Sequence, residues 1–423
     1  MRSQPVTPWR RTATGVEEGG PVSELEMLDL LIVSNGHGED AIAAHLAKVL
    51  LRRRPHVRVG AFALVGPGHA YQRAGIPLLF GSRPMPSGGF GWQHPRGFLQ
   101  DLAAGFLSLT ASQLDALRRL RPKVRGLLLV GDIYPVLLTL SYRVPRVFVS
   151  TARSDYISPH LRIETGLLAR SCQLVLARDE LTARSLVRRG VNALSVGNVM
   201  MDMLKPRGFT LGLKPGEPVL ALLPGSRRDF ADNLVALAEV VQAVKVERPA
   251  QAVAALAGSL PDPARLSGNW RLEPVGCCAE QAEGLDGWLV SGAGDVRIGL
   301  TLNGFADLLQ RADLALGLAG TANEQAAGLG KPVVSFPRPG VQYTRRFAER
   351  QKRLLGDALL LTGGPGEAAR RVVRLLDAPE ERLRRGEAGR SRMGRPGAAE
   401  RMVALIERAF GLCADCPPLF QQG

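Results

Sequence analysis

The chain has 423 residues, 45% of them hydrophobic, which is enough for two cores and too long for one ordinary domain. The formal net charge of +15 favours an anionic partner: nucleic acid, anionic lipid or a phosphorylated substrate. The sequence has no basic stripe interleaved with aromatic residues and no nucleic-acid-binding motif, so we expect no nucleic acid partner.

Signals for secretion and for a membrane span are missing from the sequence. The five cysteines are widely spaced, and Cys413 with Cys416 is better explained as two solvated thiols than as a zinc site. Residues 1–27 are polar and lack the apolar stretch of a signal peptide, so we expect a disordered extension, with Met27 as a candidate start. No apolar run reaches the length of a membrane span, which predicts a cytoplasmic protein.

The first half of the chain alternates apolar runs with helical patterns. Such alternation predicts a parallel sheet covered by helices on both faces. The predicted strands are 28–34, 57–65, 127–130, 146–149, 173–177 and 195–199, and the predicted helices are 41–53 and 98–120.

The Gly/Pro-rich stretch 205–218 has no period and predicts a linker, after which the alternation restarts. The sequence therefore predicts two doubly wound, Rossmann-like α/β domains facing a cleft, at 28–204 and 219–390. A helix at 391–412 could cross back to the first domain, before a tail at 413–423. The predicted strands after the linker are 219–223, 252–256, 287–290, 314–316 and 332–336, and the helices are 229–247, 367–376 and 398–410.

Two glycine turns in the second half each follow an apolar run and open a helical segment. The first is Leu-Leu-Pro-Gly-Ser-Arg at 222–227, and the second is Gly-Leu-Ala-Gly-Thr-Ala-Asn-Glu at 317–324. Backbone N–H groups and the positive end of a helix dipole meet at such a turn, which suits a phosphate. Arg227 adds a positive charge, and Glu324 adds a carboxylate one turn into its helix. This set suits a diphosphate and a ribose.

Helix capping is the competing explanation for both turns, because 226–229 and 321–324 match the S/T-x-x-D/E pattern. We favour a nucleotide-diphosphate site, because the two turns occur together and one carries an arginine. The P-loop sequence is absent, and so is the G-x-G-x-x-G fingerprint after the first strand, which argues against a P-loop ATPase and a dinucleotide oxidoreductase. No Asp-x-Asp pair lies near the turns, so we expect no metal.

The first predicted strand ends in Ser-Asn-Gly-His-Gly-Glu-Asp at 34–40. Its two glycines allow the backbone to approach a ligand closely, and His37 can donate to a phosphate or act as a base. Glu39 and Asp40 lie in the first helical turn, where carboxylates are favourable in any case. A helix-start role and a functional role both remain open for these two acids.

Asp132 follows another predicted strand, in Val-Gly-Asp-Ile-Tyr-Pro at 130–135. At a strand end it is the best-placed general base, able to take a proton from an acceptor hydroxyl. On the local sequence alone, an N-cap for a helix starting near Ile133 is the stronger explanation. Gly197 and Asn198 suit a tight turn before the linker, and an ordinary domain exit explains them equally well.

The segment 83–109 combines an apolar, helical pattern with flanking arginines. An apolar patch rimmed by arginine suits the surface of an anionic membrane. An amphipathic helix packed on the sheet explains the same pattern, so both interpretations stay open.

In chain order, these motifs resemble the lipid-A-disaccharide synthase family, which are two-domain glycosyltransferases of the GT-B type. The resemblance runs from about residue 28 to 410, is patchy outside the motifs, and is closest at 222–227. Gly-Thr-Ala at 320–322 is similar to the family's donor segment, and 197–202 is similar to its domain-exit motif. Asp132 before Pro135 resembles its catalytic aspartate.

That family transfers a diacylated glucosamine from a UDP donor to a phosphorylated, acylated glucosamine, with inversion, at the cytosolic face of the inner membrane. The resemblance implies an acceptor-side domain at 28–204 and a UDP-sugar donor domain at 219–390. The implied catalytic base is Asp132, with His37 as a second candidate. The implied donor-binding residues are Gly225, Ser226, Arg227, Gly320, Thr321, Ala322 and Glu324, and the acceptor-side residues are Asn35, Gly36, Gly38, Asp40 and Asn198.

The departures from the family lie in the first half of the chain. Of the opening motif only Asp40 is clearly retained, and His37 resembles instead the glycine loop of related GT-B enzymes that build peptidoglycan precursors. Asp132 stands one residue farther from its proline than in the synthases. Ser-Thr-Ala-Arg-Ser-Asp-Tyr at 150–156 replaces an apolar, tryptophan-bearing stretch. The donor chemistry is therefore better supported than the acceptor.

We predict an inverting, metal-independent glycosyltransferase that moves an acylated or plain amino sugar from a UDP donor to a lipid-linked or phosphorylated sugar acceptor. The UDP-sugar is a substrate, and no cofactor is expected. Contact with an anionic membrane through residues around 83–109 would place the protein on the inner face of the cytoplasmic membrane. Two alternatives stay open: a UDP-sugar 2-epimerase on the same fold, and a non-catalytic shell that binds a nucleotide or lipid.

Overall fold

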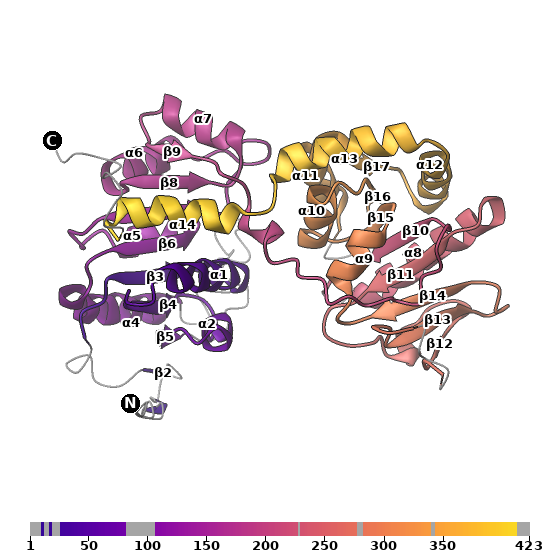
Figure 1. Cartoon of the computed structure of the whole chain (residues 1–423), viewed down its shortest axis with the longest axis horizontal. Helices are drawn as coiled ribbons and strands as arrows, with labels where there is room; N and C mark the ends of the chain where they lie inside the picture. The colour runs from indigo at the N-terminus through magenta and orange to yellow at the C-terminus, as the bar shows by residue number, and fades with distance from the viewer. Residues whose placement is uncertain are drawn as a thin grey trace. The chain divides into compact units, whose positions relative to one another are not determined.

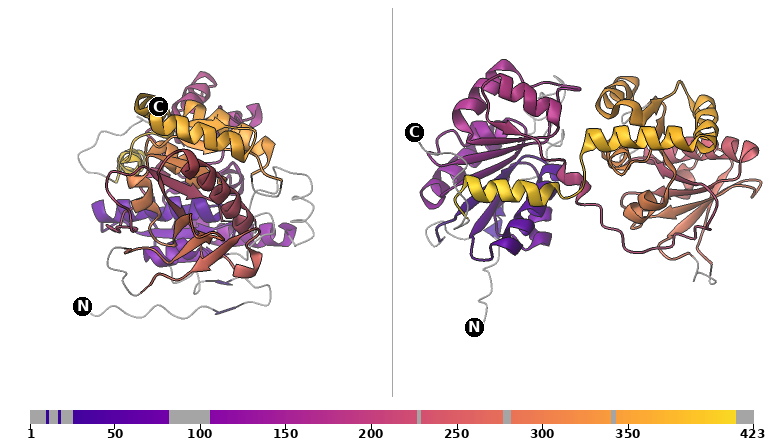
Figure 2. Two further views of the ribbon diagram at one scale, coloured as in Figure 1. Left: turned by 90° about the vertical axis from the view of Figure 1, so that its right-hand side faces the viewer. Right: turned by 45° about the horizontal axis from the view of Figure 1, so that its top comes forward.

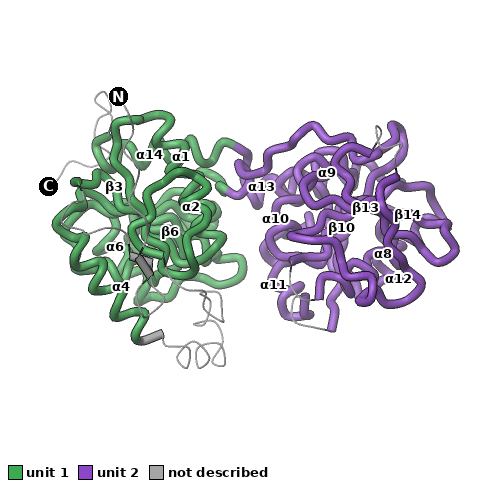
Figure 3. Tube along the Cα trace, turned by 90° about the horizontal axis from the view of Figure 1, so that it is seen from below, with its two compact units in different colours: residues 1–199, 397–423 green, residues 200–396 purple. Residues whose placement is uncertain are grey.

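The computed structural model describes residues 10–11, 17–18, 26–81, 106–226, 229–276, 282–339 and 343–412 (Figure 1). It forms two compact units: residues 1–199 with 397–423 make unit 1, and residues 200–396 make unit 2 (Figure 3). Arg227, Cys413, Cys416, nearly all of residues 1–27 and most of the segment 83–109 lie outside the described residues, and so do the predictions made for them.

The described residues of unit 1 form a nine-stranded sheet in the order β1-β2-β5-β4-β3-β6-β7-β8-β9. β1 and β2 pair antiparallel at one edge, while the strands from β5 to β9 pair in parallel. The central strands are continuous apolar runs because helices bury them from both sides. The bounds are β1 (Arg10–Arg11), β2 (Glu17–Glu18), β3 (Leu30–Ser34), β4 (Val59–Ala63), β5 (Leu78–Gly81), β6 (Leu127–Gly131), β7 (Arg146–Ser150), β8 (Leu174–Ala177) and β9 (Ala193–Leu194).

Alternate residues of these strands point to two separate cores, one on each face of the sheet. One core is covered by α1 (His37–Arg53), α2 (His69–Ala74) and α14 (Ala398–Ala409). The other is covered by α4 (Phe106–Leu120), α5 (Tyr134–Leu138), α6 (Arg162–Ser171) and α7 (Glu180–Arg188). Short 3₁₀ helices η3 (Arg121–Lys123) and η4 (Val199–Met201) join these elements.

The last helix of the chain, α14, belongs to unit 1 and packs along α1 (Figure 2). Arg53 donates two hydrogen bonds of 2.9 Å to Glu407, and Arg54 lies 3.3 Å from the same carboxylate. The Arg53 bond holds the pKa of the buried Glu407 below its usual range. The helix predicted at 391–412 is two helices, since the chain breaks at Pro396 and at Gly397, whose φ is +89°.

The described part of unit 2 contains an eight-stranded sheet in the order β12-β13-β14-β11-β10-β15-β16-β17. β12, β13 and β14 form an antiparallel meander, and the other pairings are parallel. The bounds are β10 (Val219–Leu223), β11 (Gln251–Ala255), β12 (Trp270–Glu273), β13 (Gly287–Ser291), β14 (Arg297–Thr301), β15 (Leu314–Gly317), β16 (Val333–Ser335) and β17 (Leu359–Leu361).

One large core of unit 2 lies under α8 (Phe230–Glu247), α11 (Arg345–Leu355) and α12 (Pro365–Asp377). α9 (Phe305–Arg311) contacts β10 and β11, and α10 (Thr321–Gly328) packs on α13 (Pro379–Met393). α13 approaches closely because Gly386 and Gly389 face the carbonyls of Gly330 and Ala327, where a Cβ would lie within 2.3 Å. The 3₁₀ helices are η5 (Pro263–Arg265) and η7 (Gly356–Ala358).

Most predicted strands coincide with observed ones to within two residues, but the strand predicted at 195–199 is wrong. β9 is Ala193–Leu194, and Gly197, with φ +104°, turns the chain before η4. The stretch 205–218 lies along unit 2, where the Asp307 carboxylate accepts hydrogen bonds from the backbone N–H groups of Arg207, Gly208 and Phe209. Among the described helices, none has the length and apolar character to cross a bilayer.

Candidate functional site

The strand order of each sheet reverses beside the first strand of its unit. β3 has β4 on one side and β6 on the other, and β10 has β11 on one side and β15 on the other. Loops diverge at such a switch point, so the space beyond the carboxyl ends of the strands is where these folds bind ligands. The predicted site residues follow these strands: Asn35 after β3, Asp132 after β6, Gly225 after β10 and Gly320 after β15.

Unit 2 has a pocket of about 450 Å³ at the carboxyl ends of β10, β11 and β15. The predicted donor-binding residues that line it are Gly225, Ser226, Gly320, Thr321 and Ala322. Much of the remaining lining is apolar, with Leu256, Leu302, Phe305 and Phe347. Glu324 is half-buried in α10 and is not part of the lining, whereas the next residue, Gln325, is.

Neither Ser226 nor Thr321 is the N-cap that the capping pattern requires at the two glycine turns. α10 begins at Thr321 with Gly320 as its N-cap, so Thr321 is the first helical residue instead of the cap. α8 begins at Phe230 with Asp229 as its N-cap, which leaves Ser226 outside the helix. The first N–H groups of α10 have no acceptor within the helix. They lie at the end of α10 that lines the pocket.

A buried hydrogen-bond network holds the second glycine turn. Gln351 Nε2 donates to the carbonyls of Ala319 (3.1 Å) and Gly320 (2.9 Å), and Gln351 Oε1 accepts from Tyr343 (2.7 Å). Asn323 Nδ2 donates to the same Gln351 oxygen at 2.9 Å and to Gly317 O at 3.2 Å. This network has no local signal in the sequence, because Gln351 lies in a separate helix, α11.

In unit 1 the structure brings Asn35 and Asp132 together. Asn35 Nδ2 donates to Asp132 Oδ1 at 2.6 Å, and the Tyr134 N–H donates to the same oxygen at 2.9 Å. The second contact precedes α5, whose N-cap is Ile133, so the N-cap role that the sequence suggested for Asp132 is wrong. Gly131 has φ +137°, and a Cβ there would lie 1.7 Å from Asn35 Oδ1, so only glycine fits. Within the described residues no hydrogen bond reaches Asp132 Oδ2.

Burial raises the pKa of Asp132, and the nearby charge of Glu39 adds to the rise. The hydrogen bonds from Tyr134 and Asn35 and the positive charge of Arg153 act in the opposite direction. The result is a carboxylate with one fixed oxygen and a higher proton affinity than an exposed aspartate. Both properties suit a general base.

His37 and Gly38 form the exposed start of α1, with Gly36 as the N-cap. The His37 ring lies against Gly66, whose φ is +85° and where a Cβ would meet His37 Cε1 at 2.5 Å. Glu39 Oε1 accepts a hydrogen bond of 3.3 Å from Thr151. Since α1 follows β3, the imidazole of His37 and the carboxylates of Glu39 and Asp132 lie around one end of the sheet.

Asp40 faces the interior of unit 1. Ser34 Oγ donates to Asp40 Oδ1 at 2.6 Å and lies 2.6 Å from the hydroxyl of the buried Tyr71. Burial raises the pKa of Asp40 to about 7, with a hydrogen bond from Ser34 opposing and Glu39 adding to the rise. Asn198 is buried between β9 and η4.

Ser150, His160 and Glu164 have the order of a hydrolase triad. Ser150 Oγ lies 3.1 Å from His160 Nε2, and His160 Nδ1 lies 3.5 Å from Glu164 Oε2. Ser150 is only 1% exposed, so it is not an accessible nucleophile. The three residues support the loop after β7. Among the described residues, no three His, Cys, Asp or Glu side chains gather as a metal site.

No family model and no curated protein matches the chain. Solved structures match it over most of its length. One is the UDP-GlcNAc 2-epimerase of Neisseria meningitidis bound to UDP-GlcNAc, at 13% identity and TM-score 0.55, covering 89% of this chain and 99% of that one. MurG of Acinetobacter baumannii matches at 14% identity and TM-score 0.54, covering 90% of this chain and 99% of that one. The calicheamicin glycosyltransferase CalG4 matches at 18% identity and TM-score 0.57, covering 92% of this chain and 100% of that one.

The chain has a GT-B-like fold. At these identities the likeness shows the fold of two Rossmann-like units and no particular activity. The fold is shared by UDP-sugar 2-epimerases and glycosyltransferases. The fold class predicted from the sequence is therefore confirmed at the level of two doubly wound α/β domains.

Proposed function

We propose that the chain is an inverting, UDP-sugar-dependent glycosyltransferase. The observation that carries the proposal is the unit 2 pocket, which collects five of the seven predicted donor-binding residues, from two separate glycine turns, at one switch point. The fold is shared with enzymes that act on UDP-sugars, one of them solved with UDP-GlcNAc. The amino sugar as the transferred group and a lipid-linked or phosphorylated sugar as acceptor come from the resemblance to the synthase family.

The pocket supplies what a nucleotide diphosphate needs. The start of α10 offers N–H groups and a positive dipole end to the diphosphate, and Ser226 and Thr321 add hydroxyl donors. The apolar side, with Leu256 and Phe347, suits a pyrimidine base. As the sugar–phosphate bond breaks, the oxygen of the leaving UDP gains negative charge. Fixed donors stabilise that charge.

Asp132 is the proposed base of unit 1. Asn35 and the Tyr134 N–H hold Oδ1, which leaves Oδ2 to accept the proton of the acceptor hydroxyl. The hydroxyl oxygen then bonds to the anomeric carbon while the carbon–oxygen bond to UDP breaks, so one proton moves to Asp132 and UDP leaves. Attack opposite the leaving group inverts the centre. His37 is the second candidate for proton transfer.

Calorimetric titration with UDP tests the nucleotide site. We expect binding to the full chain, and at least a tenfold loss in Thr321→Glu, because the added carboxylate would face the diphosphate. Gly366→Glu is the matched control, since it places a carboxylate in the first turn of α12, where a Cβ meets no atom within 4 Å. The absence of UDP binding in the unaltered protein would refute the proposal.

A UDP-sugar 2-epimerase is the second candidate, favoured by the grouping of His37, Glu39 and Asp132 at one sheet end. Epimerisation needs acid and base groups around the sugar and no acceptor. Incubation with UDP-GlcNAc in D₂O separates the two. Deuterium at C2 of the recovered UDP-sugar without an acceptor supports the epimerase, and UDP release that depends on an added glycolipid acceptor supports the transferase.

A further inference from the structure

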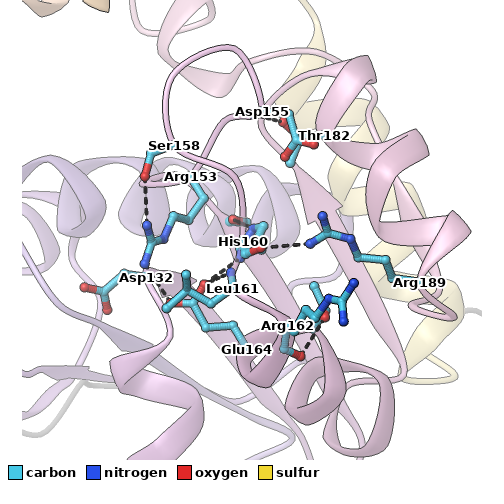
Figure 4. A network of polar contacts seen from close by, with 12 residues as sticks. Asp132, Arg153, Asp155, Ser158, His160, Leu161, Arg162, Glu164, Thr182 and Arg189 are labelled. Atoms are coloured by element: carbon cyan, nitrogen blue, oxygen red, sulfur yellow. Dashed lines mark hydrogen bonds and ion pairs between the residues drawn. The ribbon is translucent and has the colours of Figure 1, made fainter.

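Arg153 is a cation that the loop between β7 and α6 holds beside Asp132. Figure 4 shows its guanidinium between Ser158 and Glu164, on the side of the loop where Asp132 lies. Nη1 donates to Ser158 Oγ at 2.8 Å, and Nη2 donates to Glu164 Oε1 at 2.8 Å. Its side chain is 28% exposed, so the guanidinium is partly shielded from water. The head group is thus fixed in position from two sides.

The residues behind Arg153 are buried and hydrogen-bonded. Glu164 Oε2 accepts from the Leu161 N–H at 2.9 Å and lies 3.5 Å from His160 Nδ1, while Ser150 Oγ lies 3.1 Å from His160 Nε2. Burial alone would raise the pKa of Glu164, but its contacts with His160, Leu161 and Arg153 lower it to about 2. The carboxylate under Arg153 is therefore ionised over the whole working range of pH.

The loop that carries Arg153 is tied down along its length. The Asp155 N–H donates to Thr182 Oγ1 at 2.9 Å, and Arg189 Nη1 donates to the His160 carbonyl at 2.8 Å (Figure 4). Because β6 and β7 are adjacent, with Gly131 paired to Ser150, the loop begins directly beside Asp132. This arrangement fixes the guanidinium relative to Asp132.

The charged and titratable groups around Asp132 come from several elements. α1 contributes Glu39, α5 contributes Tyr134, and the loop after β7 contributes Arg153, with Glu164 of α6 behind it. Arg178, after β8, donates to the Thr151 carbonyl at 3.3 Å. Among the charged groups that act on Asp132, Glu39 favours its neutral form and Arg153 favours its ionised form.

We propose that Arg153 is a positioning residue of the reaction: its fixed charge beside Asp132 favours the ionised carboxylate, which is ready to accept a proton, and acts together with the Tyr134 and Asn35 hydrogen bonds against burial and the charge of Glu39. The mechanistic role rests on the proposed function, in which Asp132 is the base. Arg153 itself takes no proton and forms no bond to the reacting atoms. Its effect is electrostatic: the buried Glu164 sets the position of the guanidinium, while the negative charge of Glu164 offsets part of that effect.

The test is a titration of Asp132 in the full chain by carbon-13 NMR, with label at the aspartate carboxyl carbon. The Asp132 signal is identified by its loss in Asp132→Asn. In Arg153→Gln we expect the midpoint to rise by about 0.5 to 1 pH unit, a three- to tenfold gain in proton affinity. In Arg153→Lys, which keeps the positive charge, the Asp132 midpoint should lie close to that of the unaltered protein. Arg162→Gln, which removes an exposed arginine of the same region, is the matched control and should not move it.

Glu164→Gln distinguishes electrostatics from a collapse of the loop. Glutamine keeps an acceptor for Arg153 but removes a negative charge, so the Asp132 midpoint should fall, opposite to the effect of Arg153→Gln. An unchanged midpoint in Arg153→Gln, or a rise of equal size in both variants, would overturn the proposal. Thermal unfolding by circular dichroism checks that each variant is folded.

The titration needs no turnover, so it can fail or succeed independently of the proposed function. If Asp132→Asn retains full UDP release, Asp132 is not the base, and the coupling to Arg153 stands as electrostatics alone. If turnover needs Asp132 but Arg153→Gln leaves the midpoint unchanged, the base assignment stands and the inference about Arg153 is wrong. Where turnover is measurable, its acidic limb should shift in Arg153→Gln by the same amount as the midpoint.

Discussion

At the scale of single residues, unit 1 is organised around the turn after β6. Gly131 must be glycine for two separate reasons: its φ of +137° and the Asn35 oxygen that occupies the place of a Cβ. Asn35 and Asp132, 97 residues apart, meet because they follow the adjacent strands β3 and β6, and the glycine at 131 leaves room for the Asn35 amide. The sequence predicted both residues as site candidates, but not that one holds the other, because the contact is a property of the sheet order.

Gly131→Ala should destabilise the protein by about 3 kcal/mol, because the added methyl group overlaps the Asn35 amide and the backbone is strained. Gly190→Ala is the matched control: φ is +78° there, but a Cβ meets nothing within 4 Å, so only about 1 kcal/mol is expected. Urea unfolding of both variants measures the difference. Equal losses would mean that the overlap with Asn35 has no energetic weight.

Asp40 gives unit 1 a stability that depends on pH. Its folded-state pKa of about 7 exceeds the usual 3.8, so the folded protein holds the proton more tightly, and stability falls as pH rises from about 4 to 7. Three pKa units correspond to roughly 4 kcal/mol as an upper bound. In Asp40→Asn this slope should disappear.

The measurement is urea unfolding of the unaltered protein and Asp40→Asn at pH 4.5, 6 and 7.5. The advantage of the variant should grow with pH and level off above 7. Asp115→Asn, at an exposed carboxylate of α4, should follow the unaltered protein at every pH. A constant difference between Asp40→Asn and the unaltered protein would show that the buried carboxyl does not titrate in this range.

At the scale of elements, the second glycine turn of the unit 2 pocket depends on α11, a helix that comes later in the chain. Gln351 in α11 ties the carbonyls of Ala319 and Gly320 and thereby sets the direction of the first N–H groups of α10. Gln351→Met should leave these carbonyls and the Tyr343 hydroxyl without their partner, at a cost of about 2 kcal/mol. UDP affinity should fall by about tenfold, as measured by calorimetry.

Gln310→Met in α9 is the control for this change, because the Gln310 side chain is exposed. It should keep both stability and UDP affinity. If Gln351→Met lost stability but bound UDP as tightly as before, the network would support the fold without setting the turn.

The sequence predicted the elements best where helix and strand patterns are local. Leu30–Ser34 and Val219–Leu223 were found because each is an apolar run followed by glycines. The sequence did not predict the meander strand Arg297–Thr301, whose apolar run is interrupted by Gly299. Among the site residues, Ser226 and Thr321 carry a motif, whereas Gln351, Arg153 and Glu164 act through partners that the sequence alone does not place beside them.

At the scale of the whole molecule, the chain leaves unit 1 at residue 199 and returns to it at residue 397. Unit 1 is therefore incomplete until the last helix has been made, because α14 supplies Met402, Val403 and Ile406 to the core that also contains Leu46 and Leu50 of α1. Unit 2, by contrast, is one continuous segment with its own core. The two units should thus respond differently to changes near the C-terminus.

Ile406→Asp places an unpaired carboxylate at a position that is 1% exposed in unit 1, which should cost about 4 kcal/mol or more. Hydrogen–deuterium exchange with mass spectrometry should show faster exchange in β3, α1 and α14, whereas peptides from β10, β11 and β15 keep their protection and the protein keeps its UDP affinity. Leu383→Asp is the matched control, since Leu383 is 69% exposed on α13 and the same carboxylate there stays in water. Loss of protection throughout both units in Ile406→Asp would contradict this account, because the far end of the chain would then be stabilising unit 2 as well.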